Sequence, residues 1–371
     1  MATEKKCIVI DEEIPFIRGV FEPYAEVRYL KYNEISRKTL EKVDGILIRT
    51  RNSCSSALLE GSHVSFIGTA TIGTDHIDMD YCAQSGITVA HAAGCNAAAV
   101  TQYVTTALLT MVHRQRKRLK EMTFGVIGVG NIGSRVAAVA QALGMRVLLN
   151  DPPRALREGG VGFVSLESLL AQSDVVSIHV PLQADTWHLA DILFFEQLAR
   201  TPIFINTSRG EVVDEAALVR FIPKMSAVVL DVWEQEPAIS KMVLDMTSLA
   251  TPHIAGYSIE GKRNATMMVV RAAASYFGFK ALKNFSIAPS SMQTLTLSKI
   301  SKGWEEALYL LFTQIFPISE VDFRLRLAPE CFEEQRAAYS FRKDNSGYAV
   351  KGTAVELISA KVLKTLGFGI R

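Results

Sequence analysis

Short apolar runs alternate with helix-compatible stretches over the first quarter of the chain. The runs span residues 7–10, 45–48, 64–69 and 87–90. Each has the length of a strand, and the alternation of strands with helices is typical of βαβ units on a parallel sheet. The pattern predicts an α/β domain that begins near the N-terminus.

The same alternation returns between residues 121 and about 252. Here the runs at 175–178, 203–205 and 227–230 are short and largely apolar, as expected for parallel strands that are buried on both faces. A second doubly wound sheet follows from this pattern. The predicted fold class is α/β, with a flavodoxin-like first domain and a Rossmann-type second domain.

Two long helical patterns, at residues 96–113 and 260–277, flank the second sheet. The later helix would lead the chain back to the first domain, which is therefore predicted to be discontinuous. Beyond residue 289 the composition changes, and helices at 303–316 and 354–366 with charged strand-like segments indicate a small α+β domain. The predicted domains are 1–95 with 257–288, 96–256, and 289–371.

The bulk properties narrow the function classes. The net charge of +2 is nearly neutral and no segment is long and apolar enough to span a membrane, so neither nucleic acid nor a membrane is an expected partner. The N-terminal residues lead straight into a strand without the apolar run of a signal peptide, which predicts a cytoplasmic protein. Five cysteines without a Cys-x-x-Cys pair argue against a disulfide framework and a thiolate metal site, and no metal is expected.

The strand-like residues 123–127 run into a G-x-G-x-x-G turn formed by Gly128, Gly130 and Gly133, and a helical pattern follows. In this context the first glycine allows a sharp turn, the second lets the backbone approach a pyrophosphate, and the third allows helix and strand to pack closely. The pyrophosphate would rest on the N-terminus of the helix. A dinucleotide site is predicted here, against the alternative of an ordinary tight βα turn.

The next strand-like run ends in Asp151, roughly twenty residues beyond the last glycine, where a carboxylate binds the adenosine ribose hydroxyls. This carboxylate would repel a 2′-phosphate, so NAD is predicted over NADP. Arg154 lies close enough in sequence to weaken that exclusion.

Three polar segments, at 206–210, 230–237 and 251–257, follow predicted strands of the second sheet. Ligands of doubly wound sheets bind at the carboxyl ends of the strands, so Arg209, Glu236 and His253 are expected to converge there. Taken singly, these residues also fit a surface ion pair, a carboxylate at a helix start and a core imidazole.

Together the three side chains suit the oxidation of a 2-hydroxy acid. Removal of a hydride from C2 requires a base for the hydroxyl proton, and a histidine, whose ordinary pKa is about 6.5, is largely neutral near pH 7. A carboxylate on the other ring nitrogen, here Glu236, would fix the tautomer and stabilise the imidazolium. Arg209 would supply a planar fork of donors for the substrate carboxylate.

These segments and the glycine turn resemble the D-isomer-specific 2-hydroxyacid dehydrogenase family. Further stretches at 9–12, 68–78, 94–97, 151–154 and 253–262 resemble a narrower branch, in which the substrate is phosphorylated and an extra C-terminal domain forms a homodimer. The resemblance extends over essentially the whole chain. It implies NAD as cofactor, a small phosphorylated 2-hydroxy acid as substrate, and a homodimer formed through residues 289–371.

The resemblance also implies a role for individual residues. Arg209, Glu236 and His253 match the catalytic set, and Thr50, Thr71, Arg209 and Tyr257 match substrate contacts. The positions that match cofactor contacts are Gly128, Gly130, Asn131, Ile132, Gly133, Asp151, Val180, Thr207, Ser208, Asp231 and Gly256. The departures from the family pattern are Thr50 for a serine, Gln102 for a glutamate and Val180 for a threonine.

The substrate's phosphate needs cations. Arg49 or Arg51 beside Thr50 is the first prediction, with Arg342 or Lys343 as a second source. Two other functions fit the same residues: another NAD-dependent 2-hydroxyacid dehydrogenase, such as one acting on 3-phosphoglycerate, and a binding protein or corepressor that senses the dinucleotide.

Overall fold

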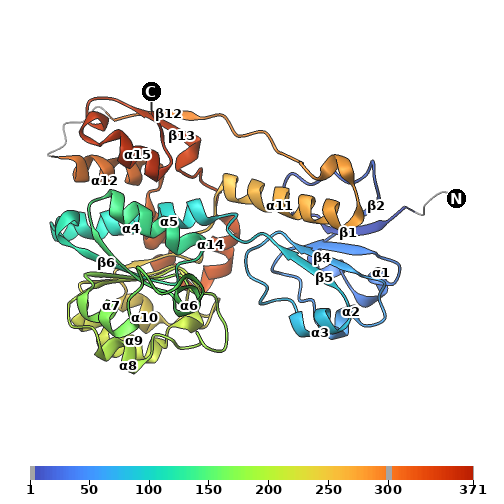
Figure 1. Ribbon diagram of the computed structural model, residues 1–371, viewed down its shortest axis with the longest axis horizontal. Coiled ribbons are helices and arrows are strands. Elements are labelled where there is room, and N and C mark those ends of the chain that lie inside the picture. Colours follow the sequence, from blue (N-terminus) through green and yellow to red (C-terminus); the bar gives the residue numbers. More distant parts are fainter. Residues whose placement is uncertain (1–4, 298–302, 371) are drawn as a thin grey trace. The chain divides into compact units, whose positions relative to one another are not determined.

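The computed structural model describes residues 5–297 and 303–370. The chain divides into two compact units, each described here by itself: unit 1 is Met1–Asn96 with Ile259–Ser290, and unit 2 is Ala97–Ser258 with Ser291–Arg371 (Figure 1). Unit 1 is discontinuous. The predicted third domain, residues 289–371, lies from residue 291 onward in the same unit as the second sheet, and its status as a domain of its own stays a prediction.

Unit 1 is built on a five-stranded parallel sheet with the order β2-β1-β3-β4-β5, which is the flavodoxin-like order. The strands are β1 (Cys7–Asp11), β2 (Glu26–Leu30), β3 (Gly45–Ile48), β4 (Phe66–Thr69) and β5 (Thr88–His91). Its short helices are α1 (Arg37–Leu40), α2 (Ser56–Leu59) and α3 (Met79–Gln84). The apolar runs missed β2, because this edge strand is only partly buried and carries polar residues.

The long helix α11 (Ile259–Phe277) covers one face of the unit 1 sheet (Figure 1). Two glycines allow the close approach. A Cβ on Gly68 would lie 2.8 Å from Val269, and a Cβ on Gly45 would lie 2.7 Å from Phe277. Both distances are shorter than a carbon contact allows, so glycine at these positions fixes how closely the helix packs on the sheet.

Unit 2 contains a six-stranded parallel sheet with the order β11-β10-β9-β8-β6-β7. The strands are β6 (Thr123–Ile127), β7 (Arg146–Asn150), β8 (Val175–Ile178), β9 (Ile203–Asn206), β10 (Ala227–Leu230) and β11 (Leu249–Ala250). The helices around it are α5 (Asn131–Ala142), α6 (Pro152–Glu158), α7 (Leu166–Gln172), α8 (Ile192–Glu196), α9 (Glu215–Phe221) and α10 (Lys241–Met246). A full Rossmann order has one more strand beside β7. Here Val164 N–H donates to Leu149 O at 2.9 Å, and no strand is assigned at this segment.

Helix α4 (Ala97–Gln115) forms the centre of unit 2 and is buried along nearly its whole length. It packs between α5 and α12 (Trp304–Ile315), and these helices share one hydrophobic core. The threonine hydroxyls of this helix donate to carbonyls four residues earlier, so burial leaves them satisfied; they are Thr101, Thr105, Thr106 and Thr110. Helix α5 covers one side of α4, and the C-terminal α12 covers another.

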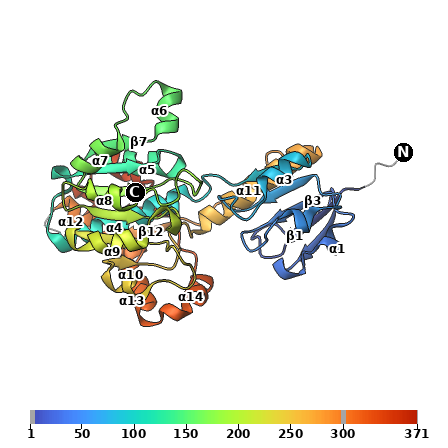
Figure 2. The same ribbon diagram turned by 90° about the horizontal axis from the view of Figure 1, so that it is seen from below.

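The C-terminal part of unit 2 adds a three-stranded parallel sheet with the order β12-β13-β14. Its elements are α13 (Ile318–Leu327), α14 (Phe332–Ala338), α15 (Ala360–Leu366), β12 (Gln293–Thr296), β13 (Tyr348–Lys351) and β14 (Gly369–Ile370). Helix α13 is attached at the edge of the large sheet, where Asp322 accepts from Ala250 N–H at 2.7 Å and Arg326 donates to Leu244 O at 2.6 Å. Figure 2 shows α13 and α14 together at this side of unit 2.

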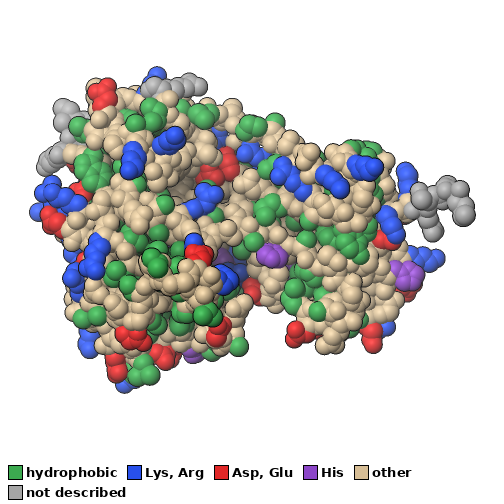
Figure 3. All heavy atoms as spheres, in the orientation of Figure 1, with side chains coloured by type: hydrophobic (Ala, Val, Ile, Leu, Met, Phe, Trp, Pro, Cys, Tyr) green, Lys and Arg blue, Asp and Glu red, His purple; other side chains and the backbone are tan. Residues whose placement is uncertain are grey.

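In the part of the chain that the structure describes, neither the charged side chains on the surface nor the apolarity of the helices points to a further functional site. On the face drawn in Figure 3, acidic and basic side chains occur on both units. Within residues 5–297 and 303–370, no helix combines the length and the apolarity that crossing a bilayer requires.

Candidate active site

The glycine turn after β6 has a separate physical reason for each of its glycines. Gly128 adopts φ +83°, and a Cβ there would lie 2.8 Å from the carbonyl of His179 and from Val180 Cγ1. A Cβ on Gly133 would overlap Gly128 O, so helix and turn touch directly. A Cβ on Gly130 would meet nothing within 4 Å. The turn is therefore closely packed at Gly128 and Gly133 and open at Gly130. The first N–H groups of α5 lie at this open side, and N–H groups at the start of a helix bind anions.

Asp151 connects the end of β7 to the glycine turn. Its Oδ2 accepts from Val129 N–H at 2.8 Å, and its Oδ1 accepts from Arg154 N–H at 2.9 Å as the cap of α6. The Arg154 side chain is held by protein acceptors, since Nη1 donates to Val129 O at 2.6 Å and Nε pairs with Glu158 at 2.7 Å. The carboxylate of Asp151 therefore lies beside the glycine turn. Arg154, the cation that the sequence suggested for a 2′-phosphate, is already bound to protein acceptors.

Two buried polar atoms at the ends of β8 and β9 have no protein partner within the described residues: His179 Nδ1 and Thr207 Oγ1. Burial lowers the pKa of His179 to about 3, so the imidazole is neutral. An unsatisfied buried polar group costs about 1–3 kcal/mol. Together with the open side of Gly130, these atoms fit a dinucleotide that lies across the carboxyl ends of the strands.

The turn after β9 presents Arg209, and Asn206 holds its shape. Asn206 Nδ2 donates to Arg209 O at 2.9 Å, while Oδ1 accepts from Ser208 N–H at 3.0 Å and Oγ at 2.8 Å. A Cβ on Gly210 would overlap the backbone of Trp233. The turn that carries Arg209 therefore rests directly on the loop that carries Glu236. The sequence pattern did not predict this role of Asn206.

His253 and Glu236 form the centre of the site. His253 Nδ1 lies 2.7 Å from Glu236 Oε2, and Glu236 Oε1 accepts from Trp233 N–H at 3.0 Å. A carboxylate can only accept, so Nδ1 carries the proton and Nε2 is left as the acceptor. Burial alone would raise the pKa of Glu236. The charge and hydrogen bond of His253, the N–H of Trp233 and the charge of Arg336 together outweigh burial, and the pKa of Glu236 lies below its ordinary value.

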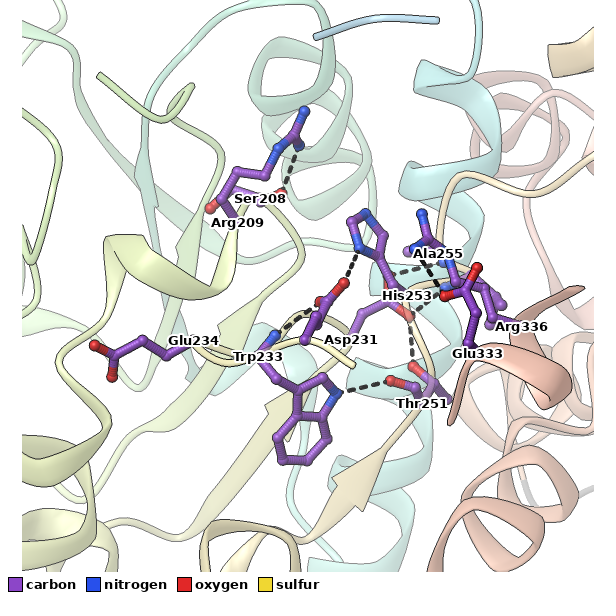
Figure 4. A network of polar contacts seen from close by, with 12 residues as sticks. Ser208, Arg209, Asp231, Trp233, Glu234, Thr251, His253, Ala255, Glu333 and Arg336 are labelled. Atoms are coloured by element: carbon purple, nitrogen blue, oxygen red, sulfur yellow. Dashed lines mark hydrogen bonds and ion pairs between the residues drawn. The ribbon is translucent and has the colours of Figure 1, made fainter. Parts of the chain in front are cut away.

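The backbone of His253 has φ +54°, a left-handed conformation that costs a non-glycine residue of order 1–3 kcal/mol. Asp231 stabilises it. The carbonyl of Asp231 accepts from His253 N–H at 2.7 Å, and its buried carboxylate accepts from Thr251 Oγ1 at 2.6 Å, Ile254 N–H at 2.8 Å and Ala255 N–H at 2.9 Å (Figure 4). Burial raises the pKa of Asp231, against these hydrogen bonds. Contact of Asp231 with the cofactor stays a prediction.

The comparisons with known proteins agree with this geometry. Residues 89–255 match the model of the D-isomer specific 2-hydroxyacid dehydrogenase NAD-binding domain. The chain is 44% identical to the erythronate-4-phosphate dehydrogenase of Bacteroides thetaiotaomicron, over 93% of this chain and 99% of that one. The chain belongs to the D-isomer-specific 2-hydroxyacid dehydrogenase family. The resemblance predicted from the sequence is thereby confirmed, as are the enzyme class and NAD as cofactor.

Other members of the D-isomer-specific 2-hydroxyacid dehydrogenase family match to different extents. The erythronate-4-phosphate dehydrogenase of Pseudomonas fluorescens is 40% identical, over 90% of this chain and 89% of that one. A solved structure, the D-lactate dehydrogenase of Aquifex aeolicus complexed with NAD and lactic acid, is 29% identical with a TM-score of 0.61. It is covered completely, yet it covers 77% of this chain.

The remaining residues predicted to contact the cofactor or the substrate belong to both units. Val180, Thr207, Ser208 and Gly256 follow strands of the unit 2 sheet, and Asn131 and Ile132 open α5; their cofactor contacts stay predictions. Thr50 and Thr71 belong to unit 1, where Thr50 is exposed and Thr71 Oγ1 lies 2.6 Å from Thr69 Oγ1. Arg49 pairs with Glu13 at 2.8 Å. Substrate contacts from unit 1 stay predictions.

The proposal of Arg342 as a phosphate ligand is wrong. The residue is 8% exposed, and Nε donates to Gln102 Oε1 at 2.7 Å. Its terminal nitrogens donate to the backbone carbonyls of Ala99, Ile254, Ala255 and Tyr257, at 2.6 to 3.0 Å. The guanidinium joins the C-terminal part of the dehydrogenase to α4 and to the loop after His253, and it has no donor left for a ligand. Lys343, the alternative, is partly exposed and donates to Ser291 O at 2.6 Å.

Asp151→Ser is expected to weaken the preference for NAD over NADP by about tenfold to hundredfold in kcat/KM. The reason is that the variant would lose the predicted charged hydrogen bonds to the ribose, worth about 1.5–3 kcal/mol, together with the predicted repulsion of a 2′-phosphate. Serine keeps the helix cap, so the fold is retained. Asp191→Ser, at the cap of α8, is the matched control with unchanged preference. Equal preference ratios in wild type and Asp151→Ser would contradict this assignment.

Glu236→Gln is expected to remove an acid-sensitive part of the stability of the enzyme. The folded-state pKa of Glu236 is lowered, so its ionised form stabilises the fold above the ordinary value of about 4.3 and loses that contribution as pH falls through the folded-state pKa. Tm should differ between wild type and variant near neutral pH, and the gap should narrow below about pH 4. The control is Glu196→Gln, at an exposed position. A Tm difference between wild type and Glu236→Gln that does not depend on pH would contradict a stabilising Glu236–His253 pair.

Proposed function

We propose that this enzyme oxidises 4-phospho-D-erythronate to (R)-3-hydroxy-2-oxo-4-phosphooxybutanoate with NAD, as a step toward pyridoxal 5′-phosphate. The observation that carries the choice of substrate is the length of the match. The relative from Bacteroides thetaiotaomicron, an erythronate-4-phosphate dehydrogenase, aligns over 93% of this chain. The D-lactate dehydrogenase of Aquifex aeolicus aligns over 77% although its own length is fully covered.

The proton step follows from the His253–Glu236 pair. Nε2 of His253 accepts the C2 hydroxyl proton as the C2–H bond breaks and the carbonyl forms. Glu236, 2.7 Å from Nδ1, stabilises the imidazolium that results. When bound, NAD accepts the hydride from C2. The strained backbone at His253, held by Asp231, keeps the ring in place during transfer.

The remaining roles in the proposal are those of binding. Arg209 holds the substrate carboxylate with paired donors and stabilises the developing carbonyl. Tyr257, four residues beyond His253, contacts the substrate, as do Thr50 and Thr71 of unit 1. The glycine turn and Asp151 hold the pyrophosphate and the adenosine ribose.

The test is NADH formation by the purified chain with NAD and a keto-acid trap that pulls the equilibrium. The substrates compared are 4-phosphoerythronate, 3-phosphoglycerate and unphosphorylated erythronate. Preference for 4-phosphoerythronate supports the proposal. Preference for another hydroxy acid keeps the family and rejects the substrate, and NAD binding without turnover of any of them favours the sensor alternative.

A cytoplasmic homodimer, formed through residues 289–371, completes the proposal. Two large apolar side chains on one face of α13 support it, since Phe323 is 65% exposed and Leu327 is 74% exposed. Exposed apolar side chains that lie next to each other are a feature of protein–protein interaction sites. Sedimentation equilibrium of the full chain tests it, and a monomer at micromolar concentration would reject it.

A further inference from the structure

The C-terminal part of unit 2 contributes a cation beside the catalytic pair. Arg336 lies on α14, and its Nε donates to the hydroxyl of Tyr257 at 3.2 Å. Arg336 also acts on Glu236, whose pKa it helps to lower, after the larger effects of burial and His253. In the view of Figure 4, His253 stands between Arg209 and Arg336. The site therefore has a guanidinium from the sheet and a second one from α14.

Unlike Arg342, Arg336 keeps donors for a ligand. Its hydrogen bond within the described residues is the one to Tyr257, and its ion pair with Glu333 is long, with Nη1 and Oε2 3.6 Å apart. The side chain is 24% exposed, and Glu333 is 48% exposed. A loose pair with an exposed carboxylate is worth little, so a dianion can displace it at small cost. The terminal nitrogens of Arg336 suit a ligand that takes two parallel hydrogen bonds.

The position of Arg336 is fixed by the surroundings of Tyr257. The Tyr257 ring packs against Tyr339 and Phe341, with ring centroids 6.2 Å and 5.5 Å apart. The backbone carbonyl of Tyr257 accepts from Arg342 Nη1 at 3.0 Å. The chain from α14 to Arg342 thus holds Tyr257 from several sides. This packing orients the Arg336–Tyr257 pair in advance of binding, which lowers the entropy lost when a ligand binds.

The chemistry of the ligand follows from the two cations. The proposed substrate has a carboxylate at C1 and a phosphate at C4, with the reacting C2 between them. His253 must reach the C2 hydroxyl, so cations on both sides of His253 match anions at both ends of a short acid. Arg209 accounts for the carboxylate. We propose that Arg336, together with the Tyr257 hydroxyl, binds the phosphate group of the substrate and selects phosphorylated acids over unphosphorylated ones. This inference rests on the proposed function for the identity of the acid.

Binding to the enzyme–NADH complex tests the inference without turnover. Titration calorimetry would compare 4-phosphoerythronate with unphosphorylated erythronate on wild type, Arg336→Ala and Arg336→Lys. The expected result is a Kd for 4-phosphoerythronate that rises about 10- to 100-fold in Arg336→Ala. The Kd for erythronate should change by less than about threefold, and lysine should recover part of the loss, because it keeps the charge and loses the fork.

The matched control is Arg324→Ala, in α13, whose side chain is 73% exposed and pairs with Glu320 at 3.9 Å. It should leave both Kd values unchanged. An equal rise for the two ligands in Arg336→Ala would show that Arg336 only positions Tyr257, and would overturn the inference, as would an unchanged Kd for 4-phosphoerythronate. The identity of the substrate is tested separately, by turnover of the wild-type enzyme. If the wild type prefers a different phosphorylated acid, the proposed function is rejected. The role of Arg336 is then tested by comparing the binding of that acid with the binding of its unphosphorylated form.

Discussion

His253→Ala is expected to lower kcat by roughly 10²- to 10⁴-fold, the usual contribution of a positioned general base. The variant loses the nitrogen proposed to accept the hydroxyl proton, while the glycine turn and Asp151 are untouched. Affinity for NADH should therefore be unchanged. Steady-state kinetics with NAD and the preferred hydroxy acid, together with titration of NADH fluorescence, measure the two quantities separately.

The chain offers a matched control for this variant. His188 and Glu234 form a second imidazole–carboxylate pair, with Nε2 and Oε1 2.9 Å apart, and His188 also has a positive φ of 48°. His188→Ala should retain most of the activity. A loss in His188→Ala as large as that in His253→Ala would mean that strain relief or misfolding, rather than the missing base, explains the effect.

Arg342→Ala is expected to destabilise the fold by roughly 3–5 kcal/mol, because several buried acceptors lose their donor at once. These acceptors are Gln102 Oε1 and the carbonyls of Ala99, Ile254, Ala255 and Tyr257. The guanidinium also lies over the ring of Phe316, 4.3 Å from its centroid. Urea unfolding at constant m-value would measure the change, and activity should fall with it since the loop after His253 loses its support.

Arg342→Met separates the hydrogen bonds from the packing. Methionine fills much of the volume but donates nothing, so it should remain strongly destabilised. Surface Arg324→Ala should change the free energy of unfolding by less than about 0.5 kcal/mol. Stability of Arg342→Met near that of wild type would show that the buried acceptors find water, and that the side chain does not hold the loop.

The sequence predicted the strands that are marked by an apolar run within their own residues. Largely apolar runs marked β3, β8, β9 and β10, because a parallel strand that is buried on both faces has few polar positions. The edge strand β2 gave no such signal, since its exposure permits polar residues. The missing strand after α6 has a local reason too. Gly159, Gly160 and Gly162 all adopt positive φ, which is incompatible with an extended chain.

The site divides in the same way. Glu236 and His253 were predictable because both follow strand ends, and the topology of a doubly wound sheet brings strand ends together. The contacts of Arg336 and Arg342 were not predictable, because they join residues 79 to 243 positions apart without any periodic pattern. The wrong assignment of Arg342 came from reading a basic residue as a surface group. Its low exposure and its protein acceptors in the structure identify it as a buried one.

The burial of α4 on two sides bears on how such enzymes can be shortened or recombined. Its outer side is covered by α12, where His113 stacks on Tyr309 with ring centroids 3.9 Å apart and Tyr103 packs near Phe316 at 5.9 Å. A chimera that lacked residues 291–371, as a shorter homologue does, would expose this apolar side of α4 to water. The helix and the C-terminal segment therefore form a single module, and a functional graft must carry both.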